Sequence, residues 1–249
     1  MDGKWNLILR ACPECNRRKA DLEDDVSAIS MQPSLVRGFA RADEALRTEA
    51  NRKSAGSRSR VTGKAVRDSS ERIELRAALA PGASVTFGLI APPQQVPGRV
   101  FELATMQLSG FFYWITFDQV RGTGGFWLGG FSPVGFSMRG DWGNPVQKAF
   151  MSRVLEWEPR IMASTADGFF KIALRRCPNA VCWSWALEWN ENVRVIGFCG
   201  ENGPIEATIG ALPAPCVSAI PVSHGHLAVR VEEELKADED LLFRWEAQV

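Results

Sequence analysis

The alternation of large apolar residues near the middle of the C-terminal half constrains the fold most strongly. Every second position from 183 to 189 is aromatic or aliphatic: Trp183, Trp185, Leu187 and Trp189. Successive side chains of a strand point to opposite faces, so these four would share one face. Residues 190–192 are turn formers, and residues 193–198 return with the apolar residues Val193, Val195, Ile196 and Phe198. This pattern predicts an antiparallel hairpin. We interpret the aromatic face as the core face of a sheet, and the alternative is a platform on which bases or another ligand stack.

Three further segments have helical signals. Residues 100–117 carry apolar residues at helical spacing and are predicted to form a buried helix, although their aromatic end is also compatible with a strand. Asn144 and Pro145 predict a helix with Asn144 as its N-cap, ending near Trp157. Residues 40–53 are rich in Ala, Glu, Leu and Arg and are also predicted to be helical.

The remaining strand signals are shorter. Residues 122–143 hold many glycines between aromatic residues, which predicts tight turns between short strands. Strands are also expected at residues 85–90 and 169–174, and residues 224–235 are compatible with a strand or a helix. Together these elements predict an α+β domain with an antiparallel sheet over residues 71–249.

Composition places the chain among ordinary soluble proteins. Of the 249 residues, 45% are apolar and 23% are charged. The longest apolar cluster, residues 111–117, is far shorter than the roughly 20 residues that a membrane-spanning helix needs. The first residues do not have the pattern of a signal peptide. We therefore expect no membrane association and a cytoplasmic location, where six cysteines indicate metal binding or buried thiols rather than disulfides.

Basic residues are concentrated in residues 36–70, which we interpret as a partly helical linker. Between Arg37 and Arg67 there are nine Lys and Arg residues, against the acidic residues Asp43, Glu44 and Glu49. Such a segment suits contacts with nucleic-acid phosphates, and it is equally compatible with a solvated linker.

Residues 1–35 contain a short sequence motif. Leu7–Leu9 is a strand-like apolar run, and Cys12-Pro13-Glu14-Cys15 follows it. A helix is predicted to start near Asn16 and to end at Pro33. Its apolar stripe is expected to comprise Leu22, Val26 and Ile29, whereas Asp24 and Asp25 lie off the stripe and are expected to face solvent.

Residues 5–30, with Asn6-Leu7, the C-x-x-C knuckle and Asn16-Arg17-Arg18-Lys19, resemble the second half of an HNH endonuclease domain, the ββα-metal nuclease unit. The resemblance implies a truncated HNH unit at the N-terminus and metal-dependent hydrolysis of DNA. It implies that Asn16 is a metal ligand and that Asn6 holds the hairpin loop of the catalytic site. Arg17, Arg18 and Lys19 would contact DNA phosphates, and the catalytic cofactor would be Mg²⁺ or Mn²⁺.

The resemblance further implies that Cys12 and Cys15 form half of a structural zinc site, because many HNH domains bind one ion with two knuckles. No second C-x-x-C is present in this sequence, so that site is incomplete. A redox dithiol and two buried thiols are the other interpretations of Cys12 and Cys15. His224 and His226 could both ligate a metal from one strand, although two ordinary histidines are the simpler interpretation.

The general base of the HNH family comes from an Asp-His pair well before the position of Asn6, and five residues precede Asn6 in this sequence. We therefore expect a nuclease whose cleavage is impaired in this polypeptide, through either a downstream start codon or a true truncation. The alternative is a non-catalytic protein that binds nucleic acid or a partner through residues 71–249. On that alternative, residues 1–35 contribute little to folding or function.

Overall fold

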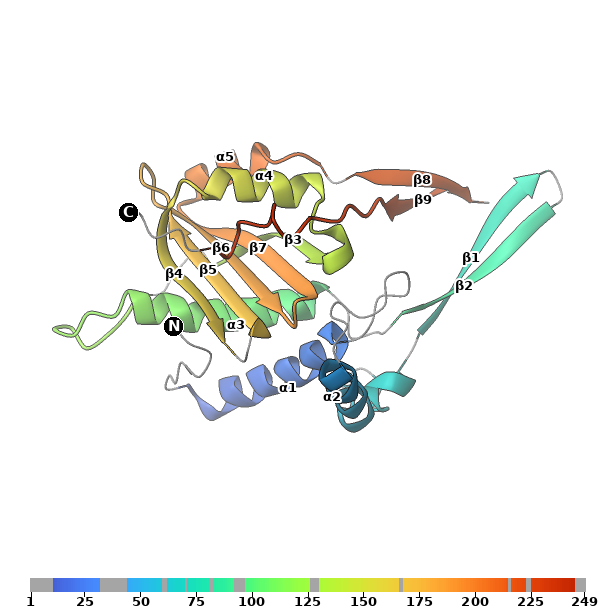
Figure 1. Ribbon diagram of the computed structural model, residues 1–249, viewed down its shortest axis with the longest axis horizontal. Coiled ribbons are helices and arrows are strands. Elements are labelled where there is room, and N and C mark those ends of the chain that lie inside the picture. Colours follow the sequence, from blue (N-terminus) through green and yellow to red (C-terminus); the bar gives the residue numbers. More distant parts are fainter. Residues whose placement is uncertain are drawn as a thin grey trace.

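A five-stranded antiparallel sheet with helices on both faces forms the body of the protein in this computed structural model (Figure 1). The structure describes residues 11–31, 44–59, 62–69, 71–80, 83–91, 97–125, 130–165, 168–214, 216–222 and 225–244. The strand order is β3-β7-β6-β5-β4. The strand bounds are β3 Ser132–Met138, β4 Glu158–Thr165, β5 Phe170–Arg176, β6 Cys182–Trp189 and β7 Val193–Gly200. The predicted α+β class and antiparallel sheet are confirmed.

The predicted hairpin lies at the centre of this sheet as β6 and β7. Its register runs from Cys182 opposite Gly200 to Trp189 opposite Val193. Asn190 and Glu191 form the turn with φ angles of 55° and 51°, and Asn192 N–H donates to the Trp189 carbonyl. Two successive left-handed residues are the geometry of a type I′ turn, whose twist matches that of the flanking strands.

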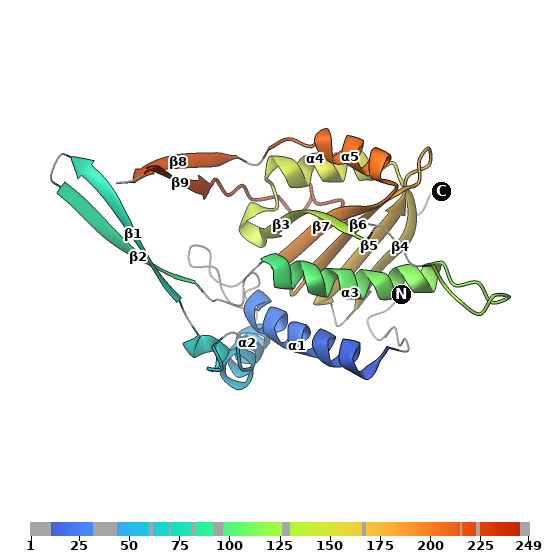
Figure 2. The same ribbon diagram turned by 180° about the vertical axis from the view of Figure 1, so that it is seen from behind.

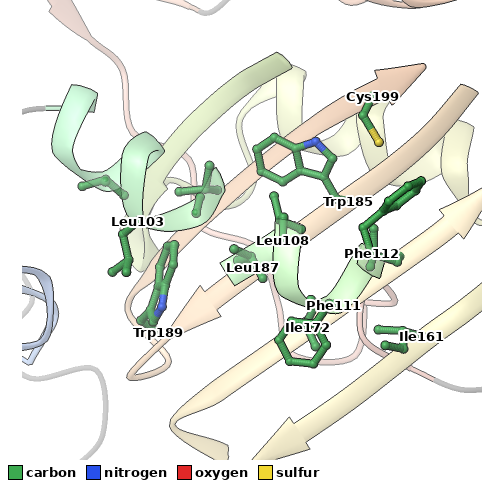
Figure 3. Close-up of a cluster of buried hydrophobic side chains, with 14 of the residues drawn as sticks. Leu103, Leu108, Phe111, Phe112, Ile161, Ile172, Trp185, Leu187, Trp189 and Cys199 are labelled. Carbon is green, nitrogen blue, oxygen red and sulfur yellow. The ribbon is translucent and has the colours of Figure 1, made fainter. Parts of the chain in front are cut away.

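The tryptophan face of the sheet is a core face, as predicted. Helix α3 (Pro97–Ile115) covers it, and Figure 3 shows Leu103, Leu108 and Phe112 of α3 facing Trp185 and Leu187 of β6. The buried side chains that the sheet contributes to this core are Ile161, Ile172, Leu174, Trp183, Trp185, Leu187, Trp189, Val193, Val195 and Cys199. Because these side chains are buried against α3, the stacking platform is excluded for this face.

Helices α4 (Pro145–Val154) and α5 (Asn202–Gly210) cover the opposite face (Figures 1 and 2). The predicted cap of α4 is confirmed, because Asn144 Oδ1 accepts a 3.1 Å hydrogen bond from Gln147 N–H and Pro145 opens the helix. Phe150, Phe198 and Leu242 are fully buried in this second core. Both faces of the sheet are therefore covered.

Helix α1 (Pro13–Ser30) packs against α3 and joins the first core. Leu22 and Val26 are buried, as the predicted stripe requires, and the side chain of Ile29 lies outside the described residues. The expectation for Asp25 was wrong: its side chain is buried and forms an ion pair with Arg99 of α3. The apolar stripe of α1 predicts which of its residues face the core. It does not predict that α3 also packs beside the stripe and buries Asp25. Asp24 is half-buried and accepts a hydrogen bond from Ser57.

The described part of the linker region contains α2 (Glu44–Gly56), close to the predicted helix, and a short 3₁₀ helix at Val66–Asp68. The division of the chain into residues 1–35, 36–70 and 71–249 stays a prediction.

Two separate hairpins extend from the same end of the body (Figures 1 and 2). The first pairs β1 (Glu71–Ala80) with β2 (Ala83–Ala91), and the second pairs β8 (Val217–Val222) with β9 (Gly225–Arg230). Strand β2 agrees with the strand predicted at residues 85–90, and β9 agrees with the strand alternative for residues 224–235 in their described part. Strands β1 and β8 were not predicted. Within the described ranges, no helix is long and apolar enough to cross a membrane.

Candidate functional site

The sequence-predicted site lies in the first turn of α1. The helix begins at Pro13, three residues before the predicted start, because proline is well suited to the first helical position. Cys12, Cys15, Asn16 and Arg17 are all exposed there. Asn6 and the predicted strand at residues 7–9 lie outside the described residues. The structure therefore brings the cysteines and Asn16 together and leaves the position of Asn6 open.

Cys12 has the role of a helix N-cap. Its carbonyl accepts a 2.9 Å hydrogen bond from Asn16 N–H, and its Sγ accepts a 3.1 Å hydrogen bond from Cys15 N–H. Contact with the Cys15 thiol, aided by that main-chain donor, lowers the pKa of Cys12 from its ordinary value. The same thiol contact raises the pKa of Cys15. Of the two thiols, Cys12 is therefore the one that becomes a thiolate more readily.

The three basic residues of the motif have different environments. Arg18 forms two hydrogen bonds with the carboxylate of Glu102 on α3, at 2.7 and 2.6 Å. Lys19 contacts Glu23 on the next turn at 2.5 Å. Arg17 is exposed and has no ion-pair partner among the described residues. The predicted DNA-contacting cluster therefore offers one cation that is not already neutralised by a carboxylate.

The residues present do not complete either metal site that the HNH resemblance implies. Structural zinc takes four ligands in a tetrahedron, and the first turn of α1 offers two thiols. A catalytic Mg²⁺ takes six oxygen ligands, of which Asn16 offers one. Across the described residues, no group of three or more His, Cys, Asp or Glu side chains is arranged to hold a metal.

A cavity of about 430 Å³ lies between α4, α5 and the turn that precedes β6. Its lining combines hydroxyl, charged, thiol and apolar groups: Ser152, Arg153, Glu156, Trp157, Cys177, Ala180, Cys182, Pro204 and Thr208. Cys177 N–H donates to the Cys182 carbonyl at 2.9 Å, which confirms the predicted turn between strands. Burial raises the pKa of Cys182 to about 11. Sequence reasoning missed this cavity because its walls come from three distant segments.

A second cluster that the sequence did not reveal is a buried row of charges. Arg194 of β7 and Glu188 of β6 face each other across the strands at 2.7 Å, and each is 1% exposed. Lys171 also contacts Glu188, and Asp240 of the C-terminal segment contacts Arg194 at 2.5 Å. The Arg194 guanidinium lies 3.8 Å from the centre of the Trp142 ring. These charges pair with one another, so the row joins the C-terminal segment to the sheet.

No protein-family model, no curated protein and no solved structure matches this chain.

Proposed function

We propose that this protein belongs to the HNH endonuclease family and acts on DNA through the first turn of α1. The observation that carries the proposal is the exposure of Cys12, Cys15, Asn16 and Arg17 at the head of α1, where DNA and a metal ion could reach them. Arg17 offers a cation for a phosphate, and the N-terminal end of a helix favours negatively charged groups.

Hydrolysis of a phosphodiester needs a base to activate water and positive charge to stabilise the phosphoryl oxygens. In the family a divalent cation, here proposed as Mg²⁺ or Mn²⁺, supplies that charge. Asn16 would be a ligand of the cation, and Asn6 would hold the adjoining loop. The printed sequence has no Asp-His pair before Asn6. This polypeptide by itself is therefore proposed to bind DNA and to cleave it little or not at all.

A plasmid-nicking assay tests this proposal. Supercoiled DNA is incubated with the protein and Mg²⁺ or Mn²⁺, and a gel-shift assay on the same mixture reports binding. The proposal expects a shifted complex with almost no nicked product. Nicking that disappears in Asn16→Ala would overturn the expected lack of cleavage and would point to a replacement base. An unshifted plasmid would contradict the proposed action on DNA.

The alternative is a binding protein that acts through the large α+β domain. One observation favours it: Arg18 and Lys19 are already engaged by Glu102 and Glu23, so two of the three cations serve contacts within the chain. On this alternative, the cavity between α4 and α5 is the first place to look for a ligand. This alternative predicts that replacing Arg17 does not change the affinity for DNA, whereas the first proposal predicts weaker binding.

A further inference from the structure

We propose that Cys177 and Cys182 form a reversible disulfide in the wall of the cavity between α4 and α5. The oxidants that the site takes are a peroxide or a small disulfide such as oxidised glutathione. The proposal is independent of the proposed action on DNA. The cavity belongs to the α4 and α5 side of the sheet, whereas α1 packs into the core on the other side.

The backbone places the two cysteines directly opposite each other. Strands β5 and β6 pair in register as far as Arg176 opposite Trp183. One step further, Cys177 N–H donates a 2.9 Å hydrogen bond to the Cys182 carbonyl. Opposite residues joined in this way in an antiparallel ladder have Cα atoms about 5.5 Å apart. Disulfides span Cα separations of about 4.4–6.8 Å, so the two thiols can join without a shift of the strands.

The side chains of both cysteines lie on the same side of the sheet and face the cavity. Cys182 is buried in the second core, and Cys177 is half-buried and packs against that core. Both line the cavity. The pKa of Cys182 reflects their closeness, because burial raises it to about 11 and the neighbouring Cys177 adds to the rise. The pair therefore borders a space of about 430 Å³ that a small oxidant can enter.

Exposure gives the two thiols different roles. The thiolate of Cys177, the more accessible of the two, attacks the O–O bond of a peroxide. An S–O bond forms, and the released hydroxide takes up a proton to become water. The sulfur of Cys182 then attacks that of Cys177, so that the S–S bond forms, the S–O bond breaks and the hydroxyl leaves as water with the Cys182 proton. The two thiols lose two electrons, and the peroxide is reduced to two water molecules.

Oxidised glutathione reaches the same product by thiol–disulfide exchange. Cys177 forms a mixed disulfide and releases one glutathione thiolate, and Cys182 then displaces the second glutathione. An excess of a reducing thiol reverses both steps. A ligand of the cavity would therefore meet two thiols in the reduced protein and a disulfide in the oxidised protein.

Peptide mass spectrometry of the full chain tests the proposal. The reduced protein is treated with hydrogen peroxide or with glutathione redox buffers, its free thiols are alkylated after denaturation, and it is digested with trypsin. Arg176 and Arg194 bound a peptide, residues 177–194, that contains Cys177 and Cys182 and no other cysteine. After oxidation this peptide should carry no alkyl group and should be lighter than its reduced, unalkylated form by two hydrogen atoms. Dithiothreitol should restore alkylation of both thiols.

Two variants and a matched control sharpen the test. Cys177→Ala should lose the disulfide and keep the circular dichroism spectrum. Cys182→Ala should leave Cys177 as a stable mixed disulfide with glutathione, because the second thiol is gone. Cys216→Ser removes a different, exposed thiol and should keep the disulfide. Two alkylated thiols in residues 177–194 after excess peroxide, a stable glutathione adduct in the unsubstituted chain, or a disulfide from this peptide to another would each overturn the proposal.

Discussion

The side-chain amide of Asn192 donates a 2.8 Å hydrogen bond to the main-chain carbonyl of Ser30, which ties the end of α1 to the β6–β7 turn. Asn190 adds a second bond from the same turn, to the hydroxyl of Ser30. Carbonyls in the last turn of a helix have no partner within the helix, and Ser30 is buried. The central hairpin of the sheet therefore caps the C-terminal end of α1, a helix of 18 residues.

Replacing Asn192 with alanine should leave that carbonyl buried without its donor. A buried polar group that loses its partner costs about 1–3 kcal/mol of unfolding free energy. Urea unfolding followed by tryptophan fluorescence measures the change. Asn179→Ala, in the exposed turn before β6, is the matched control and should change the stability by less than about 0.5 kcal/mol. Equal effects of the two substitutions would contradict the capping role.

Leu22→Ala tests whether α1 is part of the main core. Leu22 is fully buried in the cluster that α3 and the sheet share. Truncation of a buried leucine to alanine costs about 2–5 kcal/mol. Val120→Ala, at a side chain that is 97% exposed, should have almost no effect on the urea midpoint. A stable Leu22→Ala protein would instead support the alternative in which residues 1–35 contribute little to folding.

Asp240→Asn should loosen the C-terminal segment from the sheet. Asp240 accepts hydrogen bonds from buried Arg194, and hydrogen bonds to charged groups contribute about 1.5–3 kcal/mol. Amide exchange in residues 238–244 should then accelerate by about tenfold or more, because 1.4 kcal/mol corresponds to a factor of ten. Hydrogen-exchange mass spectrometry measures the exchange rates of these amides in Asp240→Asn and in the control variant Glu233→Gln. That control breaks an exposed ion pair with Lys148, which should contribute little. Unchanged exchange in Asp240→Asn would show that the ion pair does not hold the segment.

Those features that depend on neighbouring residues could be predicted from the sequence. The Asn144 cap, the aromatic strand of β6 and its return as β7 each rest on a few adjacent positions. Strand β4 was missed because its residues lack a clean alternation, and α5 was missed because glycine and proline lie in its first turn.

The candidate site was predictable only as a list of residue types. The partner of Asp25 is Arg99 and that of Arg18 is Glu102, and both partners belong to a helix more than 70 residues away. Burial and charge neutralisation at these positions come from the packing of α1 on α3. A pattern within one helix carries no information about that contact.

Alkylation rates of the cysteines test the arrangement at the head of α1. In protein treated with EDTA, iodoacetamide should modify Cys12 faster than Cys15, because the pKa of Cys12 is lowered and that of Cys15 is raised. The rate at Cys12 should rise with pH and level off below the ordinary pKa of a thiol. Buried Cys182 and Cys199, whose pKa values burial raises, should react slowest. Peptide mass spectrometry after timed quenching gives the order, and faster reaction at Cys15 would contradict the cap geometry.

The salt dependence of DNA affinity tests most directly whether the head of α1 contacts DNA. Fluorescence anisotropy with a labelled duplex would compare the wild type with Arg17→Ala and with Lys236→Ala, which removes an exposed charge from the segment that follows β9. Our account predicts that Arg17→Ala weakens binding and lowers the slope of log affinity against log salt by about one phosphate contact. Lys236→Ala should match the wild type. Identical slopes for all three proteins would contradict a role of α1 in DNA binding.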